Sequence, residues 1–411
     1  MTTAHKSMAE ASLPSSRNSG ANRVLASSRK REALGLAHVR EFTERLLETD
    51  IHPKRVLSIG NYVAGALHAA TLSVHAIGQA YAEAAQTTPK HGVKQTDRFL
   101  SNSGIKLSEI FRSWVPFVVG VRKSIVIAFD WTEFDADDHS TICAYAITSH
   151  GRATPLMWKS HTKSDLKGNQ KRWEQEILAE LHACIHESVE VTLLADRGFG
   201  DQATYQFLEL FGWDYVIRFR GDIRVEDAEG VARTGHEWVT PTGRAFILRG
   251  AKVTCDRASV PAVVIVHDKR MKDSWCLATS IHEQSASDIV KLYGKRFSIE
   301  ETFRDTKDIH FGLGLKATHI GRTDRRDRLL MLFAIAHALL TLLGAASERA
   351  GFDRKLKVNT SKKRTHSLFR QGTYWFGCLP TMREDWLLEL MPAFEHVVRE
   401  QAALCEVLGF M

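Results

Sequence analysis

Two apolar runs in this 411-residue chain each end in an aspartate, and they restrict the fold more than any other feature. The first run, within residues 124–134, delivers Asp130, and the second, residues 189–195, leads into Asp196. Apolar runs of this length are typical of strands covered on both faces of a sheet. If the two strands are neighbours, their ends bring the two carboxylates close together.

A helix predicted over residues 292–308 carries an unusual polar stripe in the sequence LYGKRFSIEETFRDTKD. A helix facing the core would place Leu, Ile or Val on such a face. Glu301 lies about 100° around the helix from Glu300 and off the stripe, so Glu300 is preferred as a third acid. At about 100° per residue, the side chains within an arc of roughly 80° are Tyr293, Arg296, Glu300, Arg304 and Lys307.

The order of predicted elements between residues 123 and 218 is three antiparallel-type strands, a helix, a strand, a helix and a strand. This is the order of an RNase H-like fold. Residues 219–285 are rich in Val, Thr and Gly in alternating runs, which predicts a β-rich insertion. The sequence therefore predicts an α/β protein with an RNase H-like catalytic core, a β-rich insertion, and helical N-terminal and C-terminal regions.

The three carboxylates have no nearby His or Cys, so they predict a hard oxygen site for Mg²⁺ or Mn²⁺ rather than zinc. Two such ions about 4 Å apart could activate an attacking hydroxyl and stabilise a leaving 3′ oxygen in phosphoryl transfer. Each aspartate alone could be an ordinary polar residue at a strand end; the combination favours metal ligation. The acidic run that follows the first strand reads as a solvated turn: Glu133, Asp135, Asp137 and Asp138.

Basic residues outnumber acidic ones, 55 Lys and Arg against 48 Asp and Glu, which favours a polyanionic partner. The excess is concentrated in residues 315–370. The runs 322–328 and 362–370 could be plain solvated surface, but their clustering after the stripe favours phosphate contact. Short helices near Lys94, Arg98 and Lys106 could form a DNA-reading unit.

The remaining composition indicates a soluble protein. The six cysteines are scattered, without CxxC pairs or metal-type spacing with His, and read as reduced thiols. The first twenty residues lack the apolar segment of a signal peptide. Residues 329–346 carry no charge over a length at the lower limit of a membrane span, but they contain His337 and Thr341 and have no second span, which favours a buried core helix.

The spacing Tyr293-x2-Arg296-x3-Glu300-x6-Lys307 resembles the Tyr-Arg-Glu-Lys signature of bacterial insertion-sequence transposases of the insertion-sequence-four family. These are DDE transposases with an RNase H-like core. AFDWTEF and LLADRGFGD are similar to that family's two catalytic-Asp blocks, and KQTDRFLSN and SKKRTHSLFRQG to its flanking blocks. The resemblance extends at least over residues 94–372.

The resemblance implies roles for individual residues. Asp130, Asp196 and Glu300 would be catalytic and would ligate two Mg²⁺ ions, for which Mn²⁺ can substitute. A Trp of the insertion would stack on a flipped base; Trp275 is the candidate, although it could equally be a core residue of an alternating strand. The residues that would grip DNA phosphates near the transposon end are Tyr293, Arg296 and Lys307, with Arg304 on the same stripe.

The resemblance also implies an activity. The protein would bind the terminal inverted repeats of its element, cut the DNA and join the ends to a target, by cut-and-paste through a hairpin. Double-stranded DNA would be its partner, with a homodimer in the synaptic complex, no membrane, and a bacterial cytoplasmic location on the nucleoid. The alternatives are an RNase H-like nuclease without strand transfer and a non-catalytic DNA-binding protein derived from a transposase.

The predicted organisation follows from these assignments. The core is expected in two parts, separated by the insertion and flanked by DNA-binding or dimerising regions. The expected divisions are a disordered basic arm at 1–32, a helical DNA-binding domain at 33–122, the first part of the core at 123–218, the insertion at 219–285, the second part with the third acid at 286–350, and a basic and helical C-terminal region for DNA contact or dimerisation at 351–411.

Overall fold

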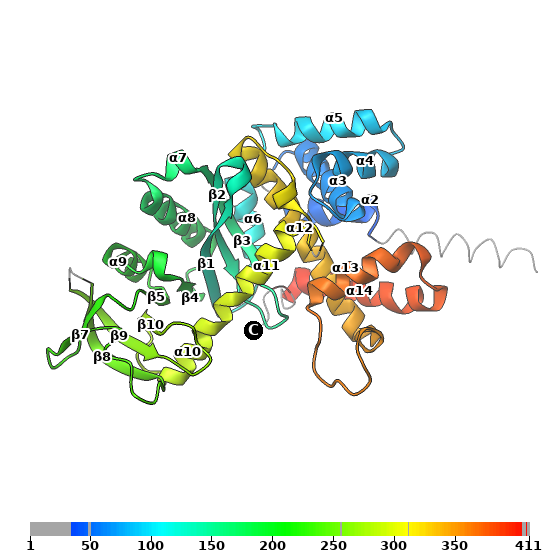
Figure 1. Cartoon of the computed structure of the whole chain (residues 1–411). Coiled ribbons are helices and arrows are strands. Elements are labelled where there is room, and N and C mark those ends of the chain that lie inside the picture. The colour runs from blue at the N-terminus through cyan, green and yellow to red at the C-terminus, as the bar shows by residue number, and fades with distance from the viewer. Residues whose placement is uncertain (1–33, 48–50, 255–256, 311, 405–407, 409–411) are drawn as a thin grey trace, which may run out of the picture.

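The structure, a computed structural model, describes residues 34–47, 51–254, 257–310, 312–404 and 408 (Figure 1). The predicted basic arm at 1–32 lies outside these residues, as do Cys255 and Cys405. Four cysteines lie within them and are free thiols, in agreement with the predicted reduced state: Cys143, Cys184, Cys276 and Cys378.

One mixed sheet forms the centre of the described molecule, in the order β3-β2-β1-β4-β5-β10-β9-β8-β6-β7 (Figure 1). Its first five strands are the core that the apolar runs predict. The strands are β1 (Ser124–Phe134), β2 (His139–Ala146), β3 (Thr154–Thr162), β4 (Glu190–Ala195), β5 (Asp214–Phe219), β6 (Arg224–Glu226), β7 (Ala232–Thr234), β8 (Phe246–Val253), β9 (Ala258–Val266) and β10 (Trp275–Thr279).

The pairing directions confirm the predicted fold class. β1 runs parallel to β4, and β4 runs parallel to β5, while β2 and β3 join as antiparallel neighbours of β1. Residues Ile125–Phe129 and Val191–Ala195 are almost all buried, because helices cover both faces of these strands. The result is an α/β protein with a large mixed sheet and helices at both ends of the chain, as an RNase H-like core with an insertion requires.

The strands of the predicted insertion do not form a separate sheet. β10 pairs antiparallel with β5, and β9 and β8 continue outward from it. The insertion therefore extends the core sheet at the β5 edge, a connection that alternating sequence patterns cannot reveal, because they report which face of a strand is buried and not its neighbour.

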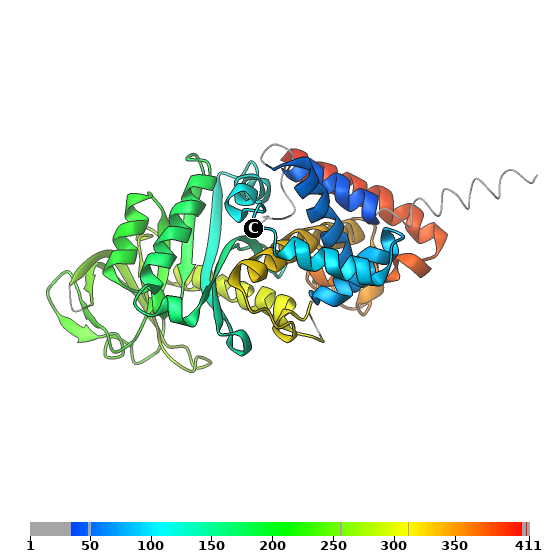
Figure 2. The same ribbon diagram turned by 90° about the horizontal axis from the view of Figure 1, so that it is seen from above.

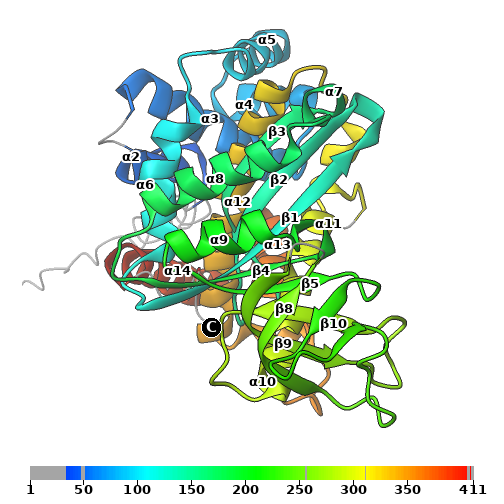
Figure 3. The ribbon, with the colours of Figure 1, turned by 90° about the vertical axis from the view of Figure 1, so that its left-hand side faces the viewer.

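Helices lie on both faces of the core strands (Figures 2 and 3). α8 (Gln170–Cys184) and α9 (Gln202–Leu210) cover one face. On the other side lie α11 (Ser298–Lys307) and α12 (Thr323–Arg349), which contact β1 and β3 respectively. The short α7 (Lys163–Leu166) follows β3, and α10 (Ala286–Gly294) leads from β10 towards α11.

The helix α12 contains the long apolar run, and within the described residues it is the one helix long and apolar enough to cross a membrane. Its most apolar window is 94% buried in the molecule, which confirms the expected core helix. It packs against α13 (Leu368–Cys378) and α14 (Glu384–Leu404). The contact with α13 depends on Gly372, where a Cβ atom would lie 1.7 Å from the Leu340 carbonyl oxygen.

The N-terminal region is helical, as predicted, and packs beside α12 (Figure 1). α4 and α5 are joined by a short turn and lie very close together: a Cβ on Gly92 would be 2.1 Å from the Gly78 carbonyl oxygen. The helices of this region are α2 (Leu36–Leu47), α3 (Pro53–Ala69), α4 (Val74–Ala84), α5 (Pro89–Leu100) and α6 (Leu107–Val119).

Candidate active site

The two aspartates lie on neighbouring parallel strands, as the two apolar runs predict, but only Asp196 follows a strand end. The strand β1 continues past Asp130 to Phe134 and stays paired with β2 there, so the prediction that Asp130 ends its strand was wrong. The parallel register pairs Phe129 of β1 with Ala195 of β4, so Asp130 and Asp196 are the next residues on neighbouring strands. Both side chains are partly exposed, at 22% and 32%. They interact electrostatically, since the Asp196 charge contributes to raising the pKa of Asp130.

The segment predicted as one helix over 292–308 is divided in the structure. α10 begins after Ser285, whose hydroxyl accepts a hydrogen bond from the Asp288 amide at 3.2 Å. A 3₁₀ turn over Lys295–Phe297 then connects α10 to α11. The tighter turn keeps the helical direction but changes the angular positions of later residues, so the stripe drawn at 100° per residue is only partly maintained.

Arg296 links two of the three acids. Its Nη1 donates to Asp130 Oδ2 at 2.8 Å, and its Nη2 donates to Glu300 Oε1 at 3.0 Å. The guanidinium is 3% exposed. Burial lowers its pKa, but Tyr293 and the surrounding carboxylates raise it more, so the net pKa is raised and the group stays charged. Glu301 instead pairs with Arg304 at 3.2 Å and lies 3.8 Å from Arg152, so Glu300 is the one of these two acids that shares Arg296 with Asp130.

Asp196 has different partners. The Tyr293 hydroxyl donates to Asp196 Oδ1 at 3.3 Å, and Arg218 Nη1 lies 3.8 Å from the same oxygen. Arg218, on β5, was not predicted from the sequence. The available signal was an Arg within the apolar part of the strand that follows the second aspartate block, residues 215–219; a charge among buried residues needs a partner.

The environment of Asp130 is unfavourable for an isolated carboxylate. Burial raises its pKa to about 6; Arg296 acts against this, while Asp196 and Glu300 add to it. The Trp131 amide donates to Asp130 Oδ1 at 2.9 Å. A positive charge placed among these three acids is therefore stabilised, and Arg296 supplies one in this structure.

The donor set fits the hard divalent cations that RNase H-like enzymes use, because it offers carboxylate oxygens. Among the described residues, no group of three or more His, Cys, Asp or Glu is close enough to hold an ion as placed. The Arg296 guanidinium lies between Asp130 and Glu300 and marks the position of a cation between them. The chemistry of the site thus suits Mg²⁺ or Mn²⁺, with Arg296 as the present counter-charge.

The last two stripe residues lie away from the acids. Lys307 donates from Nζ to the Glu133 carbonyl at 2.8 Å and stacks over the Phe134 ring at 4.7 Å; burial lowers its pKa. Arg304 is exposed and hydrogen bonds to Glu301 at 3.2 Å. The stripe therefore places Tyr293, Arg296 and Glu300 together, and the two later cations elsewhere.

Trp275 is half-buried at the start of β10 and belongs to an aromatic group beside the acids. Its ring contacts Tyr293 edge-on at 5.0 Å and lies 5.9 Å from Phe297. Phe297 was not predicted from the sequence, yet it is 41% exposed and stacks under the Arg296 guanidinium at 5.0 Å.

Two arginines of the basic run 322–328 are buried and do not form the predicted phosphate surface, whereas Arg322 is exposed. Arg326 is fully buried against the Phe134 ring and pairs with Asp137, and Arg328 is buried and pairs with Asp324 at 2.8 Å. Arg325 pairs with Asp97 of α5 at 2.7 Å. The acidic turn is likewise not wholly solvated, since Asp137 is held by Arg326. Charged residues at a helix start can serve as internal ties, and sequence alone does not distinguish the two uses.

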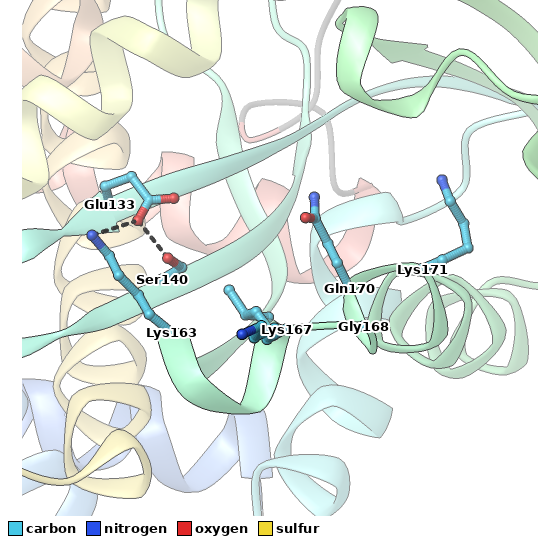
Figure 4. A pocket seen from close by; sticks show the side chains of 8 residues that line it. Glu133, Ser140, Lys163, Lys167, Gly168, Gln170 and Lys171 are labelled. Atoms are coloured by element: carbon cyan, nitrogen blue, oxygen red, sulfur yellow. Dashed lines mark hydrogen bonds and ion pairs between the residues drawn. The ribbon is translucent and has the colours of Figure 1, made fainter.

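An open pocket lies beside the β1–β2 hairpin (Figure 4). Its lysines are largely neutralised: Lys163 pairs with Asp135 at 2.6 Å, and Lys171 pairs with Asp201 at 2.5 Å and Glu174 at 2.8 Å. Charge balance therefore argues against a phosphate site there. The lining residues are Glu133, Ser140, Lys163, Leu166, Lys167, Gly168, Gln170 and Lys171.

A mixed sheet of this order, with one acid on β1 and one directly after its parallel neighbour β4, fits an RNase H-like core. The model of the family described as transposase DDE domain matches residues 122–339, just over half of the chain. The chain belongs to this family and is a DDE transposase by its domain, a class that acts on DNA. No curated protein matches the chain.

Proposed function

We propose that the chain is the transposase of a bacterial insertion sequence of the insertion-sequence-four family, which cuts DNA at terminal inverted repeats and joins the ends to a target. The observation that carries the proposal is the pair of contacts from Arg296 to Asp130 and Glu300, next to Asp196 and Tyr293. Signature residues that are far apart in the sequence meet at one place, which a purely structural role for each would not require.

The proposed roles follow from the contacts. Asp130, Asp196 and Glu300 would hold two Mg²⁺ or Mn²⁺ ions, which when bound activate the attacking hydroxyl and stabilise the leaving 3′ oxygen. Arg296 and Tyr293 orient the acids in the free protein and would bind the phosphodiester when DNA enters. Lys307 and Arg304 would contact phosphates farther along the strand. The proposal thus gives Glu300 of the Tyr-Arg-Glu-Lys signature a role in binding metal, and gives Tyr293, Arg296 and Lys307 a role in binding DNA.

The aromatic group beside the acids supports a second proposal. Trp275 and the exposed Phe297 would stack on an unpaired base next to the cleaved bond, since every base offers a flat apolar face. Base extrusion accompanies a hairpin intermediate, so cut-and-paste through a hairpin is the proposed route. A hairpin product detected on denaturing gels, and its loss in Trp275→Ala, would support this route.

Helix α5 supports the proposed DNA-binding role of the N-terminal region. Lys90, Lys94 and Arg98 are exposed at steps of four residues, so they form one ridge. None of them pairs with an acid among the described residues, in contrast to Lys163 and Lys171 of the pocket in Figure 4. An unneutralised ridge on a helix that follows a short turn is suited to DNA phosphates.

The test of the activity uses labelled DNA carrying the element's own ends, with Mg²⁺ or Mn²⁺. Asp130→Ala, Asp196→Ala and Glu300→Ala should each abolish cleavage. Matched controls are Glu301→Ala, beside the third acid, and Asp135→Ala, an exposed acid after β1. Full cleavage by any of the three acid variants would overturn the assignment. Cleavage without joined product would indicate the nuclease alternative, and DNA binding without cleavage the non-catalytic one.

A second experiment tests the ridge. The variant with Lys90, Lys94 and Arg98 all changed to Ala should bind end DNA more weakly, and the slope of log affinity against log salt should fall by about 0.9 for each lost phosphate contact. The matched control is Lys163→Ala, whose charge is already paired. An unchanged slope would exclude α5 from the DNA surface.

Sedimentation with and without end DNA tests the proposed dimer of the synaptic complex. Imaging in bacteria tests the proposed cytoplasmic, nucleoid-associated location.

A further inference from the structure

The side of α11 that faces away from the acids carries a buried carboxylate. Asp305 is fully buried. Its two oxygens accept hydrogen bonds from Arg152 Nε and from Arg152 Nη2, the latter at 3.5 Å, and Arg370 Nη2 lies 3.4 Å away. Burial raises the pKa of Asp305, and the two guanidiniums act against that. This carboxylate stands outside the proposed chemistry and takes no part in it.

The same side of α11 makes a second attachment to the loop that joins β2 and β3. The Thr302 hydroxyl accepts from the Ala153 amide at 3.0 Å and lies 2.9 Å from the Ala153 carbonyl, to which it donates. Thr302 and Asp305 are three residues apart and so share one face of the helix. The loop therefore holds α11 at two neighbouring points, through Ala153 and Arg152.

The attachment continues into the C-terminal region. Arg370 is in the first turn of α13, and Arg364, just before that helix, donates to the Ser149 carbonyl at 3.4 Å and to Glu348 at 2.6 Å. The segment 364–370, the loop before β3 and α11 thus meet around Asp305. This segment follows the exposed Lys362 and Lys363.

Glu300 has little of its own to fix its position. It lies about 140° around the helix from Asp305, its side chain is 51% exposed, and its hydrogen-bond partner among the described residues is Arg296. Arg296 must release or share Glu300 if a cation is to take its place. The direction of the Glu300 side chain then depends on the position of α11. The contacts of Thr302 and Asp305, on the other side of the helix, determine that position.

We propose that Asp305 is a positioning residue for Glu300: through Arg152 and Arg370 it sets the rotation and depth of α11, and so couples the C-terminal segment 364–370 to the third acid. This rests on the proposed role of Glu300. Asp305 acts through the helix and touches neither substrate nor ion.

The test compares full-length variants by two readouts that do not require activity. Asp305→Asn removes the charge at nearly constant shape, and Arg370→Gln removes one of its two partners. Asp327→Asn is the matched control, because Asp327 is also a buried carboxylate but contacts β3 through the Ser160 amide at 2.9 Å. Mn²⁺ affinity is measured from the free-ion electron paramagnetic resonance signal, and the protection of residues 299–306 by hydrogen exchange.

Asp305→Asn should weaken Mn²⁺ binding about tenfold, as loss of a supporting contact behind a metal ligand does, and should speed exchange in α11 more than in the other elements. Arg370→Gln should act in the same direction but less. The fold-change in Mn²⁺ affinity of the double variant should be smaller than the product of the fold-changes of the two single variants, because the residues contact each other. Asp327→Asn should leave Mn²⁺ affinity and α11 exchange unchanged.

Three results separate the possibilities. Unchanged α11 exchange and Mn²⁺ affinity in Asp305→Asn would overturn the positioning role. A loss of protection in α11 that is no larger than the loss in the other elements would also overturn it, since that is only a general stability effect. If the wild-type protein binds no Mn²⁺ and Glu300→Gln cleaves DNA normally, the proposed function fails; α11 exchange then decides whether Asp305 positions the helix.

Discussion

Helix α11 carries charged side chains on two sides, and the two sides hold them differently. Towards the strand ends, Glu300 is half exposed and shares one guanidinium with Asp130, so three acids are grouped around few cations. On the other side, Asp305 is fully buried between Arg152 and Arg370. The first side has an excess of negative charge that a ligand can relieve, and the second is neutralised within the protein.

The comparison suggests how to separate acids for chemistry from acids for stability. A buried charge without sufficient partners raises the free energy of the fold and is retained where a ligand uses it. A buried charge that is fully paired costs much only when one partner is removed. Substitutions on the two sides of α11 should therefore affect different measurements.

The largest effect is expected on activity. Asp130→Asn should lower DNA cleavage by at least about a hundredfold, as the loss of one essential charge-stabilising group does, while the free energy of unfolding stays the same or increases, because a poorly solvated charge is removed. Single-turnover cleavage and urea denaturation measure the two quantities. If Asp130→Asn cleaves DNA normally and unfolds more easily than the wild-type protein, the expected difference between the two sides of the helix is contradicted.

Asp305→Ala should give the opposite result in denaturation. It leaves two guanidiniums without their buried partner, which costs about 3–5 kcal/mol of unfolding free energy. The midpoint of urea unfolding should fall accordingly. The matched comparison is Glu301→Ala, an exposed acid that touches the same Arg152 at 3.8 Å and should cost far less. Equal costs for the two would show that burial does not matter here.

The pH dependence of stability distinguishes a paired buried acid from a poorly paired one. Burial raises the pKa of Asp327 to about 7. Its folded pKa is thus above the unfolded value, so its contribution is fully present below about pH 4 and is lost as pH rises through about 7. Relative to the wild-type protein, Asp327→Asn should become more stable across this window, by up to about 4 kcal/mol. A constant difference between pH 4 and 8 would contradict this.

The smallest effect is expected at the exposed end of α11. Arg304 pairs with Glu301 three residues earlier, and both side chains are exposed. Arg304→Ala should change the free energy of unfolding by less than about 1 kcal/mol. If Arg304 contacts DNA, the same variant should weaken end binding more at low salt than at high salt. A large loss of unfolding free energy in Arg304→Ala would show that Arg304 stabilises the fold.

The predicted fold was close to the observed one because it depended on local signals. The apolar runs before Asp130 and Asp196 required strands covered on both faces, and the uncharged run at 329–346 required a core helix. The failures concern charge. Arg326 and Arg328 read as surface cations but are buried, because a basic run looks the same in sequence whether its partners are phosphates or protein carboxylates.

Two residues of the site, Arg218 and Phe297, were not predicted, because each depends on a feature that leaves no pattern in the sequence. Arg218 reaches Asp196 from the neighbouring strand β5, and Phe297 is exposed because a 3₁₀ turn interrupts the helix at that point. Neither the order of strands in the sheet nor the tightening of a single turn leaves a periodic trace in the sequence. A charged residue among the apolar residues 215–219 was the signal that could have indicated Arg218.

The sequence by itself determined the element types, the association of two acids with two buried strands, and the membership of Tyr293, Arg296 and Glu300 in one segment. The tertiary structure decided which charges meet: Arg296 with Asp130, 166 positions apart, and Arg152 with Asp305, 153 apart. The physical reason is that local periodicity depends on neighbouring residues, whereas the pairing of buried charges depends on which elements pack together and exclude water.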